Sequence, residues 1–174
     1  MSDIQGPEAS QGHTKQAVAK LYVGYLRMIC DFLELENRQI LCKYTDEELA
    51  ESFNGIGPES FPDWIVSAMD SISPELLPVC LIHDIEWLES DGTRESFHAS
   101  NGRLRRNGKI VAKSLYGFWN PKRYVVMWKS RAFAKACEKF GWDTWNDYFL
   151  ASTVEKRNGP PALPTIPQAF RVRG

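Results

Sequence analysis

The sequence lacks the features that mark several protein classes. None of its 174 residues belong to an apolar run of about 18 or more, so no membrane-spanning helix is expected. The start, MSDIQGPEASQGH, has no basic region followed by an apolar stretch, so we expect no signal peptide. Four cysteines show neither zinc-ligand spacing nor the density of a disulfide scaffold. We therefore expect free thiols and a cytoplasmic location in the producing cell.

Common motifs of nucleotide-binding and hydrolytic enzymes are also missing. The sequence contains no GxxxxGK[ST], GxGxxG, GxSxG or HExxH pattern. Its three histidines are His13, His83 and His98, and His13 lies in the polar N-terminal segment. A metal site built from several histidines is therefore not expected.

Composition and periodicity predict a mainly α-helical protein. Apolar residues make up 43% and charged residues 25%, which is ordinary for a soluble globular chain. We expect a disordered N-terminus at residues 1–13, a single mainly helical domain at 14–157, and a Pro-rich extended tail at 158–174. Strand signals are sparse, and no internal repeat is evident.

Individual helices follow from apolar spacing and capping signals. A helix from Thr14 carries an apolar stripe at helical spacing, formed by Val18, Leu21, Tyr22, Tyr25, Ile29, Phe32 and Leu33. Thr45 and Glu48 predict a capping box for a short helix at 46–52. Further helices are expected at about 62–72, 74–89, 94–108, 126–140 and 143–156. The segment 113–123 fits either a short hairpin or a loop.

Charge is distributed unevenly along the chain although its net value is only −1. Residues 45–102 contain thirteen acidic side chains and one basic one, whereas residues 103–139 contain eleven basic side chains and one acidic one. The two segments either form complementary solvated faces or provide a cation site and a basic patch. Such a patch at 103–139 would bind an acidic protein, an anionic lipid or a nucleic acid. The six tryptophans fit either a core or a lipid interface.

One set of polar residues points to chemistry. His83 and Asn101 lie nine residues before and after Gly92, so an antiparallel helix hairpin would bring them level. Both residues also have an ordinary structural interpretation. His83 would then be a core histidine, and Asn101 would be an amide inside a helix that bonds to the backbone. Asp84 follows His83, and the Gly-rich segment 53–57 offers carbonyl oxygens. Carbonyls together with a carboxylate suit Ca²⁺.

These motifs resemble those of phospholipases A2. FNGIG at 53–57 is similar to their aromatic-x-Gly-x-Gly calcium loop, and LIHDIEW at 81–87 is similar to their His-Asp active-site helix. The likeness is greatest to the compact domains of parvovirus capsid proteins and related phage proteins, and it covers residues 52–107. It implies an antiparallel helix hairpin preceded by the calcium loop, with extra N- and C-terminal helices. Association with a virion or a host is a further implication.

The resemblance also implies a role for each matching residue. His83 would be the general base that takes a proton from water, and Asn101 would stand where the family has the aspartate that orients the histidine. The N–H of Gly55 would help to hold the oxyanion. Trp87 would take the place of a tyrosine that bonds the aspartate in the family. The implied Ca²⁺ ligands are the carboxylate of Asp84 and the backbone carbonyls of Phe53, Gly55 and Gly57.

Two functions follow from this comparison. The first is a calcium-dependent phospholipase A2-like hydrolase that cleaves a phospholipid acyl ester at a membrane surface. The second is a weakly active or inactive binding protein on the same scaffold, a phage or virus accessory factor that uses its basic C-terminal third. The second is favoured by Asn101, which cannot stabilise an imidazolium by charge, and by Trp87, which offers only an N–H donor.

Overall fold

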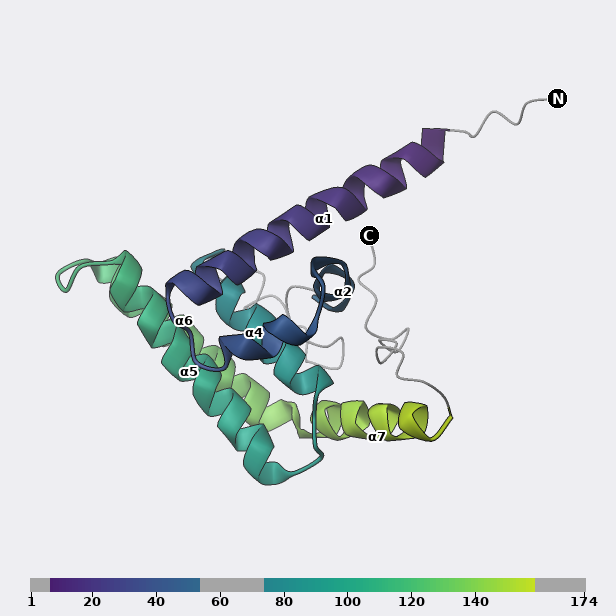
Figure 1. Cartoon of the computed structure of the whole chain (residues 1–174). Coiled ribbons are helices and arrows are strands. Elements are labelled where there is room, and N and C mark those ends of the chain that lie inside the picture. Colours follow the sequence, from purple (N-terminus) through teal and green to yellow (C-terminus); the bar gives the residue numbers. More distant parts are fainter. Residues whose placement is uncertain (1–6, 54–73, 159–174) are drawn as a thin grey trace.

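The computed structural model describes residues 7–53 and 74–158, with side chains described over 18–53 and 74–153. These residues form helices and connecting turns, and no strand occurs among them (Figure 1). The mainly α prediction is therefore confirmed for this part of the chain. The elements are α1 (Pro7–Phe32), the 3₁₀ helix η1 (Arg38–Lys43), α2 (Asp46–Ser52), the 3₁₀ turn η2 (Pro74–Leu76), α4 (Leu77–Leu88), α5 (Arg94–Leu115), α6 (Pro121–Phe140) and α7 (Trp142–Asn158).

Helix α4 forms the centre of the molecule. Ten of its 12 residues are buried, in line with its nearly continuous apolar sequence. It packs against α1, α5, α7 and η1, which surround it in Figure 1. Pro78 lies in the first turn, where the missing N–H costs no hydrogen bond. A polar side chain on α4 is therefore held inside the core and needs a partner there.

Several local predictions are confirmed. Thr45 caps α2, and the reciprocal bonds between Thr45 and Glu48 form the capping box. Gly92 adopts a φ of 72° in the turn before α5, a left-handed conformation that favours glycine. Segment 116–120 joins α5 and α6 without a strand, which agrees with the loop interpretation. The helix expected at 62–72 lies outside the described residues. None of the described helices is long and apolar enough to cross a membrane.

Helix α5 continues past the end that was predicted near residues 107–108. Asparagine followed by glycine predicts a helix end here, but the buried side chain of Asn107 accepts a hydrogen bond from the N–H of Glu36 at 2.7 Å and donates to the Glu36 carbonyl at 3.1 Å. Gly108 allows α5 and α6 to pack closely, because a Cβ there would lie 2.0 Å from the Oγ of Ser130. Both residues thus serve tertiary packing, and the helix ends at Leu115.

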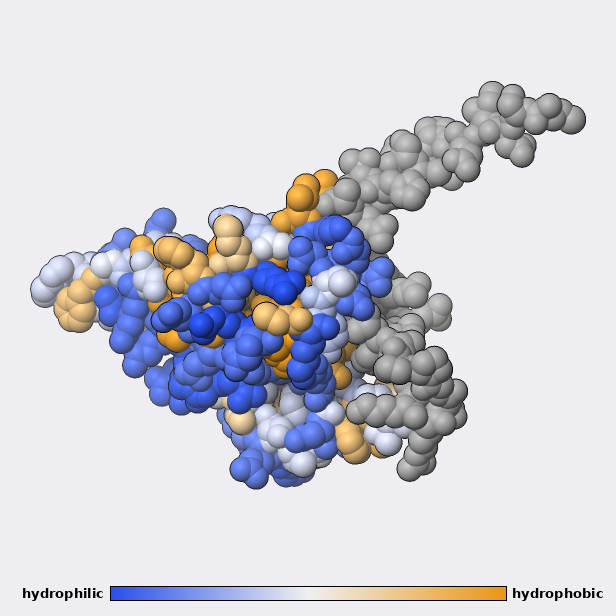
Figure 2. All heavy atoms as spheres, viewed as in Figure 1, coloured by the Kyte–Doolittle hydropathy of each residue, from blue (hydrophilic) through white to orange (hydrophobic). Residues whose placement is uncertain are grey.

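The boundaries and the exposed face of α1 also differ from the prediction. The helix begins at Pro7 rather than Thr14, so residues 7–13 are helical and not disordered. Its core contacts come from Val23, Leu26 and Cys30. Most of the predicted apolar stripe faces outward, as shown by Leu21, which is 75% exposed, and Phe32, which is 84% exposed. Figure 2 shows apolar colour on this helix.

The apolar stripe of α1 faces outward because this helix has apolar residues on two sides. A helix with apolar residues on both sides does not reveal from periodicity which side packs. The thiol of Cys30 donates to the carbonyl of Pro78 at 3.2 Å, which brings α1 against the start of α4 on that side. Helix α7 extends through Asn158, one residue into the predicted tail, and residues 1–6 and 159–174 lie outside the described part.

Candidate functional site

The structure brings His83 of α4 and Asn101 of α5 together, as the sequence spacing predicts. The Nε2 atom of His83 lies 3.0 Å from Oδ1 of Asn101, in a hydrogen bond buried from solvent. The two side chains are only 4% and 2% exposed. The turn between the helices fixes this pairing, since the hydroxyl of Thr93 caps α5 by accepting from the N–H of Ser96. The simple geometric argument about Gly92 therefore gives the correct partner.

This hydrogen bond determines which nitrogen of His83 carries the proton. An amide oxygen only accepts, so Nε2 must donate, and the neutral ring then leaves Nδ1 unprotonated. Burial lowers the pKa of His83, and the bond to Asn101 offsets part of that effect. The ring is therefore neutral near pH 7, and Nδ1 can accept a proton.

Aromatic rings enclose the histidine. The ring of Trp87 lies 5.0 Å from that of His83, and the ring of Phe133 lies 6.0 Å away, measured between centroids. The indole N–H of Trp87 and the amide Nδ2 of Asn101 are buried and have no hydrogen-bond partner in the part of the chain that the structure describes. Trp87 therefore packs beside the site but does not supply the bond that a tyrosine makes in phospholipases A2.

A buried ion pair next to His83 was not anticipated from the sequence. The carboxylate of Glu86, one turn along α4, accepts from Nε of Arg103 at 2.5 Å and from the amide of Asn37 at 2.6 Å. Glu86 is buried and Arg103 is partly buried, so the pair lies in surroundings that strengthen its attraction. The spacing of three residues between His83 and Glu86 is the signal that could have revealed this neighbour.

Asp84, which follows His83 on α4, is a second perturbed group at the site. Burial raises its pKa to about 7. The residue as a whole is half-buried, but its Oδ2 atom is shielded from solvent and has no hydrogen-bond partner among the described residues. Helix α7 packs against α4 here, and burial followed by the charge of Asp84 raises the pKa of Tyr148 on α7. An ionised carboxylate without a partner is costly to bury. A bound cation would remove that cost, so Asp84 fits one ligand of a calcium site.

Of the other expected Ca²⁺ ligands, only Phe53 lies among the described residues. Phe53 follows α2 in an extended conformation and packs partly buried against the core. Gly55 and Gly57 lie outside the described residues. Within 7–53 and 74–158, no three side chains of His, Cys, Asp or Glu form a metal-binding group. The resemblance implies backbone carbonyl oxygens as the other protein ligands of a cation at Asp84.

Comparison with protein-family models, with curated proteins and with solved structures gave no match to this chain.

Proposed function

We propose that this protein is a calcium-dependent hydrolase of phospholipid acyl esters, in which His83 activates the attacking water. The observation that carries the proposal is the buried hydrogen bond between His83 Nε2 and Asn101 Oδ1. It leaves Nδ1 with a free lone pair, as a general base requires. Helices α4 and α5 are the two helices of the proposed phospholipase A2-like hairpin.

The chain's own residues perform the proton transfer in this proposal. His83 Nδ1 accepts a proton from water while the water oxygen attacks the ester carbonyl carbon. The same proton then passes to the leaving alkoxide, so the products are a fatty acid and a lysophospholipid. Asn101 keeps the ring oriented throughout, but its neutral amide gives the imidazolium no charge stabilisation. We therefore expect slower turnover than an aspartate at this position would give.

In this proposal, Ca²⁺ would be held by one carboxylate and by backbone carbonyls. Asp84 would supply its carboxylate ligand, supported by the buried Oδ2 atom that lacks a partner. Phe53, Gly55 and Gly57 would supply carbonyls, as the resemblance implies. When bound, Ca²⁺ would act as a Lewis acid toward the ester carbonyl.

The test is release of fatty acid from phospholipid in mixed micelles, measured with Ca²⁺ and with EDTA. We expect activity that requires Ca²⁺ and that falls by about 100-fold or more in His83→Gln. His98→Gln is the matched control, because His98 is an exposed histidine whose Nδ1 pairs with Glu138 away from the site. Activity that persists in EDTA and in His83→Gln would contradict the proposal.

The alternative is a binding protein with weak or no catalysis on the same scaffold. It is favoured by the unpartnered N–H of Trp87 and by the amide at position 101. A folded wild-type protein that binds Ca²⁺ or anionic partners but releases no fatty acid would support this alternative. Calorimetric titration with Ca²⁺, comparing wild type with Asp84→Ala, tests the cation site independently of turnover.

A further inference from the structure

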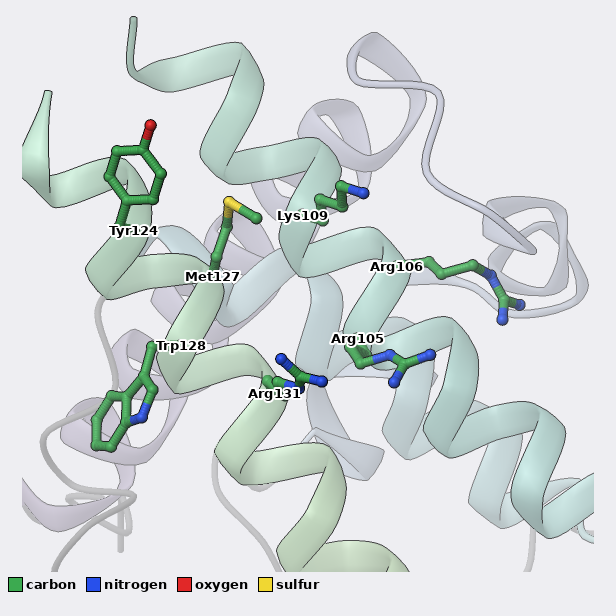
Figure 3. A pocket seen from close by; sticks show the side chains of 7 residues that line it. All are labelled: Arg105, Arg106, Lys109, Tyr124, Met127, Trp128 and Arg131. Atoms are coloured by element: carbon green, nitrogen blue, oxygen red, sulfur yellow. The ribbon is translucent and has the colours of Figure 1, made fainter. Parts of the chain in front are cut away.

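A basic groove lies between α5 and α6, on residues outside the proposed catalytic site (Figure 3). Its volume is about 440 Å³. Helix α5 contributes Arg105 and Lys109, and α6 contributes Arg131, Trp128 and Tyr124. No acidic side chain lines it. The groove thus combines cations with aromatic rings, a pairing suited to an anionic ligand that also has an apolar part.

Three of the four cations of this groove have no carboxylate partner among the described side chains. Arg106 also borders the groove, but it pairs with Glu36 and points toward it. By contrast, Arg131 extends from α6 toward α5, and Arg105 extends from α5 away from Arg131. Among the residues whose side chains are described, Arg105, Arg131 and Lys109 form no ion pair. Guanidinium groups match the oxygens of a phosphate particularly well.

The groove continues into an apolar tip at the end of the α5–α6 hairpin. The tip presents Trp119, which is 90% exposed, beside exposed Phe118 and Leu115. In Figure 2 the corresponding end of the molecule is white to orange, whereas neighbouring surface is blue. Exposed apolar side chains gathered at one end are typical of a surface that contacts another apolar phase.

The tip is held in one conformation despite its exposure. The hydroxyl of Tyr124 donates to the Phe118 carbonyl at 2.9 Å, and the side chain of Asn120 caps α6 by accepting from the N–H of Lys122. The rings of Phe118 and Trp119 pack edge to face at 5.1 Å. Because Tyr124 also lines the groove, it connects the apolar tip directly to the basic surface.

We propose that the α5–α6 hairpin docks on an anionic phospholipid membrane, with the lipid phosphate in the groove and the apolar tip at the acyl boundary. A membrane is favoured over a nucleic acid because aliphatic Leu115 and Val125 are exposed here as well as aromatic rings. Stacking on bases uses aromatic rings but not aliphatic side chains. Tryptophan next to cations is typical of a membrane interface. This inference builds on the proposed function by naming the surface on which the hydrolase acts.

The test is vesicle binding by flotation, in EDTA so that turnover is absent. Vesicles of phosphatidylcholine alone are compared with vesicles that also contain phosphatidylglycerol. We expect wild type to bind the anionic vesicles at least about tenfold more tightly, and Arg105→Glu/Arg131→Glu to lose that preference. Lys139→Glu is the control, since Lys139 is an exposed cation two turns further along α6. It should change binding less than about threefold.

A second variant separates the tip from the charges. Phe118→Ser/Trp119→Ser should weaken binding at least about tenfold at high salt, where electrostatic attraction is screened. Equal losses in Lys139→Glu and in the groove variant would overturn the inference, as would unchanged binding by the tip variant. Tighter binding to a single-stranded oligonucleotide than to vesicles, lost in the groove variant, would also overturn it.

Binding and catalysis remain distinguishable in these experiments. His83→Gln should bind anionic vesicles as wild type does, because its substitution lies outside the groove. If the groove variant keeps its vesicle preference while His83→Gln is inactive, only the docking inference fails. If groove-dependent binding is present but no fatty acid is released, only the proposed hydrolase fails.

Discussion

His83 donates from Nε2 to Oδ1 of Asn101 across 3.0 Å, between two helices that a single short turn connects. The acceptor is neutral, so it holds the imidazole in place and favours its charged form less than a carboxylate would. This relationship makes residue 101 the position at which the chemistry of the site can be changed with little change in shape.

Asn101→Asp should raise the pKa of His83, because a negative charge beside the ring favours the imidazolium. We expect a rise of about one unit or more, followed by proton NMR of the His83 ring as a function of pH. If the hydrolase proposal is correct, fatty-acid release near pH 8 should increase at least about tenfold. Asn101→Leu, which removes the acceptor at similar volume, should lower activity instead. An unchanged His83 titration in Asn101→Asp would contradict this account of the pair.

Asp84→Asn should stabilise the calcium-free protein more at alkaline pH than at acidic pH. Burial raises the pKa of Asp84 to about 7, so the folded state keeps a proton that the unfolded chain loses near its ordinary pKa of 3.8. The contribution of Asp84 to the free energy of unfolding therefore falls as the pH rises from about 4 to above 7. We expect the advantage of the variant in EDTA to grow by about 1–3 kcal/mol between pH 5 and pH 8.5.

Urea denaturation at both pH values measures this difference. Added Ca²⁺ should stabilise wild type at pH 8.5 and leave Asp84→Asn unchanged, since the variant lacks the anionic ligand. A constant difference between the two proteins across this pH range would show that Asp84 is not buried as described.

Gly108→Ala should destabilise the α5–α6 packing even though alanine is the better helix former. A Cβ at this position would lie 2.0 Å from Ser130 Oγ and 2.3 Å from Ser130 Cβ. Overpacking of this kind costs about 1–3 kcal/mol, measured by thermal or urea denaturation. Gly117→Ala is the control, because its Cβ would meet no atom within 4 Å. Equal stability of the two variants would contradict the close helix contact.

Leu26→Ala and Leu21→Ala test which side of α1 packs against the body. Leu26 is fully buried, so its truncation should cost about 2–5 kcal/mol of unfolding free energy. Leu21 is exposed, so the same truncation should change stability by less than about 0.5 kcal/mol. Urea denaturation of both variants provides the comparison. The reverse order would mean that the apolar stripe predicted from periodicity faces the core after all.

The sequence was sufficient to predict the parts of the site that depend on local rules. The capping box at Thr45 and the meeting of His83 with Asn101 both follow from spacing along the chain. Both depend on helix geometry over a few turns, which can be read from a single sequence.

Features that depend on tertiary contacts were not predictable in this way. A glycine such as Gly108 is typical of a helix end, and only its contact with Ser130 of α6 shows that it allows close helix packing. The choice between the two apolar sides of α1 depends on the shape of the body beneath it. Likewise, Arg103 reaches Glu86 through the packing of α5 on α4. The calcium loop at 53–57 stays a prediction beyond Phe53.

The bonds from Asn107 to both backbone groups of Glu36 have a consequence for cooperativity. A single side chain on α5 supplies the pairing that an adjacent strand would otherwise give to the linker after α1. If α5 loosens near this residue, the linker loses a donor and an acceptor at once. Hydrogen exchange should therefore show the α1 linker and the middle of α5 opening as one unit rather than as separate segments.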